Sequence, residues 1–388
     1  MTESEINARL ARLRQHMITV IVALTVGIAT TLAWSIITWS AALRHGYSPG
    51  GTWAWDRWDS GLYRFIAEHG YYLERCNGVP NRAPSDYCGS AGWFPLYPYT
   101  LRALGVTGIG VTTLGRWVAV MAMTFTYAGL WHGFLRRHPL HKQILVLLLA
   151  AAFPAGVYFG AIFPVSIVTA SAIACLYALQ RERFLLAGLC GMFASAAYSS
   201  GIVIPVAAAL IPLATCRLGP WRNRLRSSLQ VAMPGVLTFA AVMANFRRTT
   251  GRWDAWFRIQ DTYHYQYAFP LATVVRRVDS IIDGVTPNAI GVQTGFVVIL
   301  VVLAGVVART HWKDLGLGER AVVPVTAAMW LGPLTLGGDL SIYRAESLLL
   351  PVVILLARSR TGVLAALVIV AVPLSYSMAT LFFQNVLI

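Results

Sequence analysis

Charge is scarce in this sequence, and lysine is nearly missing. Charged residues make up 12% of the 388 positions, and the only lysines are Lys142 and Lys313. A soluble globular domain carries about twice that charged fraction, which excludes a soluble enzyme as the main part of the chain. The net charge of +15 comes from arginines scattered along the sequence. No nucleic-acid-binding motif accompanies them, so we expect no nucleic-acid partner.

We also expect no cleavable leader. The polar N-terminus, with Arg9, Arg12 and Arg14, is followed by an apolar run that is too long for the core of a signal peptide. We interpret this run as a retained first membrane span, with the N-terminus in the cytoplasm.

Long apolar runs dominate the rest of the chain. The sequence is 57% hydrophobic, with a mean hydropathy of +0.60. Many runs reach the roughly 20 residues that a helix needs to cross the hydrocarbon core, and they lack the alternation of barrel strands. We predict an all-α, polytopic bundle forming one domain over residues 1–388. About eleven spans are expected, centred on residues 18–42, 108–134, 143–162, 165–180, 184–198, 200–216, 228–246, 289–308, 321–336, 346–357 and 361–386.

The distribution of basic residues predicts the orientation. Because positively charged short loops stay in the cytoplasm, the arginine-rich loops mark the cytoplasmic side. The opposite side then holds two long external segments, residues 43–107 and 247–288, and a shorter one near 337–345, which together carry most of the acids. We therefore expect any chemistry to be extracytoplasmic. The preference for arginine over lysine is typical of a high-GC bacterial genome, so we predict a bacterial plasma membrane protein. The cytoplasmic loops cover residues 136–142, 181–183, 217–226, 309–313 and 358–360.

The first external segment holds the most informative polar residues. Between Trp55 and His69, helical spacing puts large apolar residues on one face and Asp56, Asp59 and Tyr63 on another. We expect an amphipathic helix at the membrane interface, with tryptophans at headgroup depth. Asp56 is interpreted as an N-cap or a supporting group. Spacing leaves two alternatives for Asp59, which either solvates the helix or acts as a catalytic carboxylate.

Two of the five cysteines lie in this same segment. Cys76 and Cys88 are on the oxidising side, and we predict that they form a disulfide. No nearby histidine or second cysteine pair completes a zinc ligand set. We therefore predict no metal and no cofactor.

Two blocks of this segment resemble a known family. They are Trp58-Asp59 with Phe65-Ile66-Ala67-Glu68-His69-Gly70-Tyr71, and then Trp93-Phe94-Pro95-Leu96-Tyr97-Pro98. Together they resemble the signature of the PIG-V-like mannosyltransferases of the GT-C class, which are similar to the second mannosyltransferase of glycosylphosphatidylinositol assembly. Weaker similarities are Phe153-Pro154-Ala155, Gln260-Asp261-Thr262-Tyr263-His264 and Tyr343-Arg344.

The resemblance implies a GT-C-like fold and a reaction. Members of the family take a sugar, usually mannose, from a polyprenyl- or dolichyl-phosphate donor. They transfer it with inversion to a lipid-linked acceptor on the side away from the cytoplasm, and their general base corresponds to Asp59. The chain departs from the family pattern at Phe159-Gly160-Ala161-Ile162 and at Tyr198-Ser199-Ser200-Gly201. These departures leave the glycolipid acceptor open, and a polyprenyl-phosphate arabinose donor stays an alternative.

The phosphate leaving group of such a donor needs positive charge, which arginine supplies through paired hydrogen bonds. We predict Arg344, Arg64 and His264 as the donor phosphate-binding residues. An ion pair between Arg344 and Glu346 is the structural alternative. The residues expected to contact sugar or acceptor are Tyr63, Trp93, Tyr97, Gln260 and Tyr263. Aromatic residues of the second external segment either stack on sugars or form an interfacial belt.

Two other classes of protein remain open from the sequence. A transporter or flippase for a lipid-linked saccharide would place charges inside its spans and often shows two similar halves. This chain has few charges inside its spans and no internal repeat. A catalytically inactive scaffold of a wall-assembly complex is the third class. The enzyme is favoured, with membrane lipids, a polyprenyl-phosphate sugar donor and a glycolipid acceptor as its partners.

Overall fold

The computed structural model describes residues 3–48, 50–80, 82–263, 267–283, 287–335 and 342–387. The chain is mostly helical, with 77% helix and 2% strand, which confirms the predicted helical class. Five helical stretches in the described residues are long and apolar enough to cross a membrane. They are Arg9–Arg44 in α1 (Glu3–Arg44), Val111–Leu135 in α4 (Val111–Leu130) with its extension η3 (Trp131–Leu135), α10 (Trp221–Thr250), α13 (Asn288–His311) and α17 (Thr361–Phe383).

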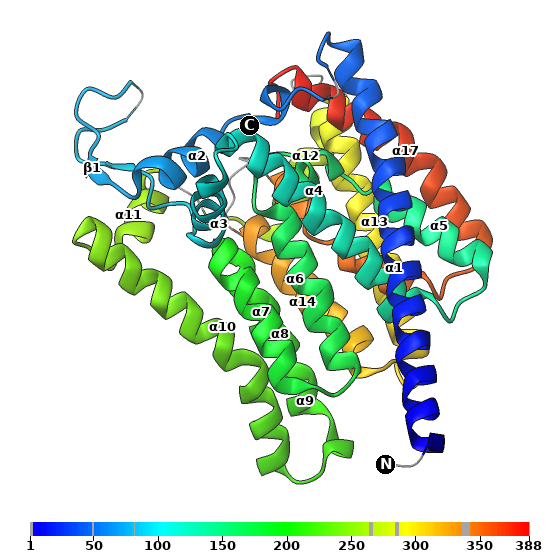
Figure 1. Ribbon diagram of the computed structural model, residues 1–388. Coiled ribbons are helices and arrows are strands. Elements are labelled where there is room, and N and C mark those ends of the chain that lie inside the picture. The colour runs from blue at the N-terminus through cyan, green and yellow to red at the C-terminus, as the bar shows by residue number, and fades with distance from the viewer. Residues whose placement is uncertain are drawn as a thin grey trace.

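Shorter helices fill the middle of the bundle. In Figure 1, α6, α7, α8 and α14 stand between α10 on one side and α1 with α17 on the other. Helices too short to cross lipid alone are tolerated where they contact protein on all sides. The count of eleven spans stays a prediction. The bounds are α5 (Leu140–Ala151), α6 (Val165–Gln180), α7 (Phe184–Ala197), η5 (Ser199–Ile202), α8 (Val203–Ala208), α9 (Leu210–Ala214), η6 (Cys216–Leu218), α14 (Leu317–Thr335), η7 (Leu350–Val352) and α16 (Val353–Leu356).

The predicted span over residues 143–162 is wrong in its second half. Helix α5 ends at Ala151, and an irregular buried segment, residues 152–164, follows and contains the short helix η4 (Gly156–Phe159). Prolines at both ends interrupt the helix pattern. A Cβ atom added at Gly160 would lie 2.1 Å from Arg116 Nη1 and 2.2 Å from a ring atom of Trp34, so only glycine fits there. Non-helical backbone at such depth needs this complete burial.

The two long segments predicted to be external meet at one end of the bundle. Their elements gather at the top of Figure 1, around α2 and α3. A second apolar cluster joins them, in which Ile66 and Phe94 contact Phe246 and Ile259. Their elements are η1 (Trp53–Trp55), α2 (Ser60–His69), the antiparallel pair β1 (Leu73–Arg75) and β2 (Tyr87–Gly89) with Glu74 opposite Cys88, α3 (Leu96–Leu104), η2 (Gly105–Thr107), α11 (Ala255–Asp261) and α12 (Pro270–Asp283). The short helix α15 (Ile342–Ser347) begins in the shorter segment and contacts this end through Arg344 and Asp59.

The basic loops gather at the other end, where the N-terminus lies in Figure 1. Direct contacts connect them from loop to loop. The links are Lys142 Nζ to the Ser359 carbonyl oxygen at 2.7 Å, Arg358 to Glu319 at 2.8 Å, the Gly318 N–H to Gln180 Oε1 at 3.0 Å, and Arg217 to Glu182 at 2.8 Å. The loops that the sequence assigns to one side therefore form one surface.

The contact between α7 and α10 offers a test of the packing. A Cβ atom at Gly188 would lie 2.2 Å from the Gln230 carbonyl oxygen, whereas one at Gly305 meets nothing within 4 Å. We expect Gly188→Ala to destabilise the protein by roughly 1–3 kcal/mol through overpacking. Gly305→Ala should stabilise it by up to about 1 kcal/mol, because glycine weakens a helix interior. Thermal unfolding in detergent measures both, and equal melting temperatures would contradict this packing.

Candidate active site

An ion pair between two distant segments lies at the centre of the site. Asp59 directly precedes α2, and Arg344 lies in α15, 285 residues further along the chain. Arg344 Nη1 donates a hydrogen bond to Asp59 Oδ2. The arginine side chain is only 6% exposed, whereas the aspartate side chain is 27% exposed. Asp59 is therefore the member of the pair that a ligand reaches first.

Aromatic rings enclose the guanidinium group of Arg344. Its central carbon lies 4.6 Å from the ring centroid of Phe163 and 5.4 Å from that of Tyr158. Both rings belong to the irregular buried segment. The alternative ion pair with Glu346 is wrong, because the Glu346 carboxylate instead accepts a hydrogen bond of 2.7 Å from Gln293 Nε2. The Nε atom of Arg344 is buried without a hydrogen-bond partner.

Asp59 keeps one carboxylate oxygen free. Its side chain makes no capping hydrogen bond to α2, and Oδ1 accepts none from any described residue. Trp58, just before it, has a φ of 44°, a left-handed conformation that costs a bulky residue energy and is often found at functional sites. The backbone therefore turns sharply at Trp58, just before Asp59 and the start of α2.

The structure corrects the amphipathic helix predicted from Trp55. The helix begins only at Ser60, and Trp55 is 1% exposed. Its ring lies 3.7 Å from the guanidinium of Arg116, a buried arginine of α4, which draws the tryptophan into the core instead of the headgroup layer. Asp56 does not cap the helix, because its two oxygens pair with Arg64 at 2.9 and 3.2 Å.

Two other arginines of the first long segment, Arg57 and Arg102, have partners elsewhere. Arg57 donates to Asn385 Oδ1 at 2.7 Å and so attaches this segment to the C-terminus. Arg102 donates to the carbonyl oxygens of Ala67 and Ile66, at the end of α2. His264 lies outside the described residues. Of the predicted phosphate ligands, Arg344 contacts Asp59, and Arg64 is held by Asp56.

The predicted sugar-contacting residues differ in exposure. Tyr97 is fully buried, and its hydroxyl donates to the Gly115 carbonyl oxygen at 2.9 Å. It therefore supports the site from inside the core. Tyr63 is 1% exposed and meets the Tyr97 ring edge-on at 5.4 Å. Trp93, Gln260 and Tyr263 are half-buried and form the part of this set that is open to a ligand.

Tyr263 connects the second segment to Asp59. Burial raises the pKa of its hydroxyl, and the negative charge of Asp59 raises it further, so the two groups are electrostatic neighbours. Arg82 lies 5.1 Å from the Tyr263 ring and donates to the Thr262 carbonyl oxygen at 2.6 Å. Sequence reasoning missed Arg82 and Tyr158, because neither belongs to a motif. Their partners became visible only in three dimensions.

A polar cavity of about 440 Å³ lies beside this contact, between the strand pair and α11. The guanidinium of Arg75 covers the Tyr87 ring at 4.1 Å, and a disulfide joins Cys76 to Cys88 at the base of this hairpin. Mixed charges and an aromatic ring suit a polyhydroxylated ligand. The cavity is lined by Arg75, Ser85, Asp86, Tyr87, Arg252, Arg258, Asp261 and Thr262.

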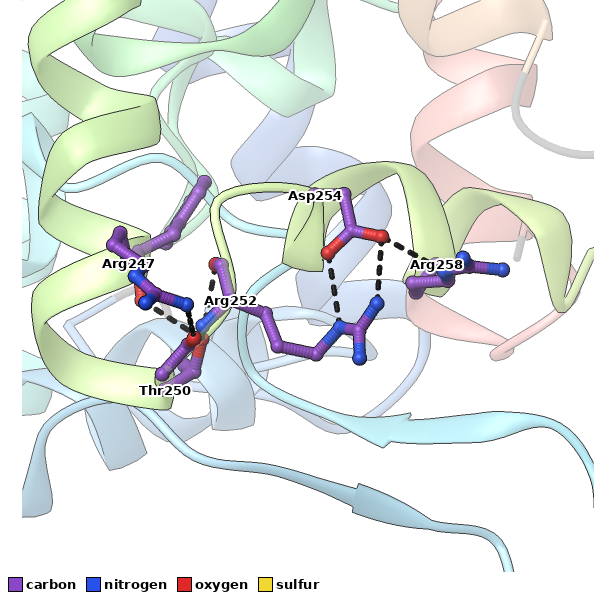
Figure 2. Close-up of polar contacts among 7 residues, drawn as sticks. Arg247, Thr250, Arg252, Asp254 and Arg258 are labelled. Atoms are coloured by element: carbon purple, nitrogen blue, oxygen red, sulfur yellow. Dashed lines mark hydrogen bonds and ion pairs between the residues drawn. The ribbon is translucent and has the colours of Figure 1, made fainter.

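Two arginines fix one wall of that cavity through Asp254 (Figure 2). Arg252 binds both carboxylate oxygens at 2.9 Å, and Arg258 binds one of them at 2.9 Å. Hydrogen bonding from Arg252 lowers the pKa of Asp254 to about 2. The carboxylate therefore stays charged at neutral pH and holds α11 at the turn that follows α10.

Comparison with known protein families and with curated proteins gives no match. In the described ranges, no group of three or more histidine, cysteine, aspartate or glutamate residues is placed to hold a metal ion.

The hairpin disulfide is open to direct chemical test. Because Cys76 is buried, alkylation is carried out in denaturant; without reductant, we expect Cys76 and Cys88 to resist alkylation, whereas the thiol of Cys216 should react. Reduction of the denatured protein should make all three reactive. Peptide mass spectrometry of protein purified in detergent gives the result, with Cys216 as the internal control. Labelling of Cys76 before reduction would show that the bond is not formed.

Proposed function

We propose that this chain is an inverting membrane glycosyltransferase of the PIG-V-like, GT-C class. It transfers a sugar, expected to be mannose, from a polyprenyl-phosphate donor to a lipid-linked acceptor on the extracytoplasmic face. Asp59 is the general base. The proposal includes about eleven spans, a cytoplasmic N-terminus and a bacterial plasma membrane. The observation that carries it is the pairing of an accessible Asp59 with a buried Arg344.

The geometry of Asp59 suits a single base. An acceptor hydroxyl is a poor nucleophile, so a carboxylate must take its proton as the new C–O bond forms at the anomeric carbon. The bond from that carbon to the donor phosphate breaks, and the polyprenyl phosphate leaves with the electron pair. Inversion requires no second carboxylate as nucleophile. Asp56 supports this division of roles, because Arg64 occupies both of its oxygens.

Arg344 supplies the positive charge that the leaving phosphate needs. Its planar guanidinium matches a phosphate better than an ammonium group does. Before the donor binds, the same guanidinium holds one carboxylate oxygen of Asp59. We infer that donor phosphate competes for Arg344 and thereby releases Asp59. The base would then become active only when the donor is present.

Helix α12 offers a path for the lipid tail of the donor. One face contributes Val274 to a cluster with Leu334 of α14 and Ile342 of α15, close to Arg344. The opposite face exposes an apolar row at helical spacing, which suits contact with hydrocarbon chains. The exposed fractions are 59% for Leu271, 47% for Val275, 36% for Val278 and 85% for Ile282. A polyprenyl chain lying there would bring its phosphate to α15.

The acceptor is proposed to approach from the polar side, near Tyr263 and the 440 Å³ cavity. Tyr263 is an electrostatic neighbour of Asp59, and Thr262 beside it lines the cavity. A polar glycolipid headgroup in the cavity would be held next to Asp59 by the disulfide-closed hairpin.

Asp59→Asn tests the base. Asparagine keeps the size and can still accept a hydrogen bond from Arg344, but it takes no proton, so transfer should fall by at least ~100-fold. Asp56→Asn is the matched control and should have a smaller effect. Transfer from synthetic polyprenyl-phosphate mannose is measured in membranes, with melting temperatures to check folding. Near-normal activity of Asp59→Asn would reject the assignment, and the reverse order of effects would make Asp56 the base.

Arg344→Ala tests donor recognition. The KM for donor should rise more than the KM for acceptor, and Arg344→Lys should restore donor use only partly, because an ammonium group cannot form paired hydrogen bonds. Arg64→Ala is the matched control. The assay uses sealed vesicles of known orientation, offered nucleotide-mannose, polyprenyl-phosphate mannose or polyprenyl-phosphate arabinose. Transfer from the nucleotide sugar alone, with polyprenol-linked synthesis blocked, would overturn the proposal. Movement of a lipid-linked saccharide without transfer would favour the transporter.

A further inference from the structure

A second charged cavity lies far from Asp59, on the surface formed by the basic loops. Its volume is about 210 Å³, and residues from four separate parts of the chain line it. Four of them are arginines, and one is an acid. The lining residues are Gly133, Phe134, Arg136, Arg137, His138, Tyr177, Gln180, Arg181, Glu319 and Arg358.

Among the described residues, an acidic side chain pairs with only one of these arginines. Glu319 binds Arg358 at 2.8 and 3.0 Å and also accepts the Gly316 N–H at 2.9 Å. The side chains of Arg136, Arg137 and Arg181 make no hydrogen bond or ion pair with any described residue. Three like charges facing one cavity repel one another, and an anion between them removes that repulsion.

The positive charges around the cavity also act on His138. Partial burial lowers the pKa of His138, and the nearby charges of Arg358 and Lys142 lower it further, against the weaker opposite effect of Glu319. A neutral His138 at pH 7 can donate or accept a hydrogen bond inside the cavity without adding to the repulsion.

The backbone is shaped around this cavity. At the end of α4, the chain widens into the π-helix η3, and the Arg136 N–H bonds to the Trp131 carbonyl oxygen at 3.0 Å. Such turns cost helical regularity and are frequent at functional sites. A Cβ atom at Gly133 would lie 2.9 Å from the Tyr177 ring, so glycine allows α4 and α6 to approach here. Trp131 Nε1 donates to Gln143 at 2.6 Å and fixes the turn.

We propose that this cavity binds the phosphate of an anionic phospholipid headgroup. Arginine recognises phosphate through paired hydrogen bonds, and basic pockets between spans on the cytoplasmic side bind such headgroups. The volume is below the roughly 300–1,000 Å³ of a site for a drug-sized molecule, which suits a headgroup with its chains outside. Leu140 and Ile144 of the adjacent α5 are 69% and 49% exposed and offer apolar contact for acyl chains. The site is independent of the proposed transferase activity.

The alternative is that these arginines only set membrane orientation and act through their summed charge. The chain provides a matched control for that alternative. Arg183, Arg309 and Arg360 are also exposed residues of the basic loops, make no side-chain hydrogen bond or ion pair with described residues, and do not line the cavity. Replacing either set with glutamine removes three positive charges.

The experiment compares R136Q/R137Q/R181Q with R183Q/R309Q/R360Q and the wild-type chain. Each protein is stripped of lipid in detergent and titrated with phosphatidylglycerol, phosphatidylcholine or inorganic phosphate, and bound lipid is counted by native mass spectrometry. We expect one tightly held phosphatidylglycerol on the wild type and on the control variant. Binding to the cavity variant should be at least ~10-fold weaker, because charge-assisted paired hydrogen bonds are lost.

Each outcome decides the proposal. Equal weakening of phosphatidylglycerol binding in both variants would overturn the proposal in favour of diffuse charge. Phosphatidylcholine binding as tight as phosphatidylglycerol binding would also overturn it, because the site would then not select an anionic headgroup. Displacement of the lipid by millimolar inorganic phosphate, with equal thermal stabilisation, would identify a site for a soluble anion instead. If the cavity variant does not fold, R136K/R137K/R181K replaces it, and intermediate affinity is expected because charge remains without the planar guanidinium. Wild-type affinity in the lysine variant would reject paired recognition of phosphate.

Discussion

The contact between Arg344 and Asp59 constrains the end of the bundle where the two long segments meet. Arg344 is almost fully buried, and a buried charge that loses its partner costs about 3–5 kcal/mol. The folded chain must therefore keep the start of α2 next to α15, although 285 residues separate them. The irregular segment with Phe163 and Tyr158 completes the enclosure, because ring faces stabilise a guanidinium where water is excluded. That requirement explains why this irregular segment is wholly buried.

Neighbouring contacts hold the short stretch around Asp59 at both ends. On one side, Arg57 reaches Asn385, and Trp55 lies against Arg116 of α4. On the other side, Arg102 binds the last carbonyl oxygens of α2. These contacts come from three different helices or termini, so the position of Asp59 depends on the assembled bundle. The left-handed backbone at Trp58 persists only because the surroundings are fixed in this way.

The sequence predicts what depends on local composition and spacing. It predicts the helical class from apolar runs, and it selects Asp59, Arg344 and the two external cysteines from motif and compartment. It fails where a distant partner overrides local periodicity. Helical spacing placed Trp55 on an interfacial face, but the buried Arg116 draws it inward. Spacing also made Asp56 a cap, although a bidentate partner eight residues away was available in Arg64.

Comparison of three ion-paired aspartates supports the proposal that Asp59 is the general base. Arg64 occupies both oxygens of Asp56, and Arg252 with Arg258 occupies both oxygens of Asp254. Those two pairs hold segments in place, and both oxygens of each carboxylate are already bound to arginine. Asp59 has one oxygen held by Arg344 and, among the described residues, no hydrogen-bond partner on the other, while its side chain is 27% exposed and that of Arg344 is 6% exposed. The open oxygen lets a ligand reach the carboxylate in the resting site, and release of the held oxygen by donor phosphate would complete the proposed general base.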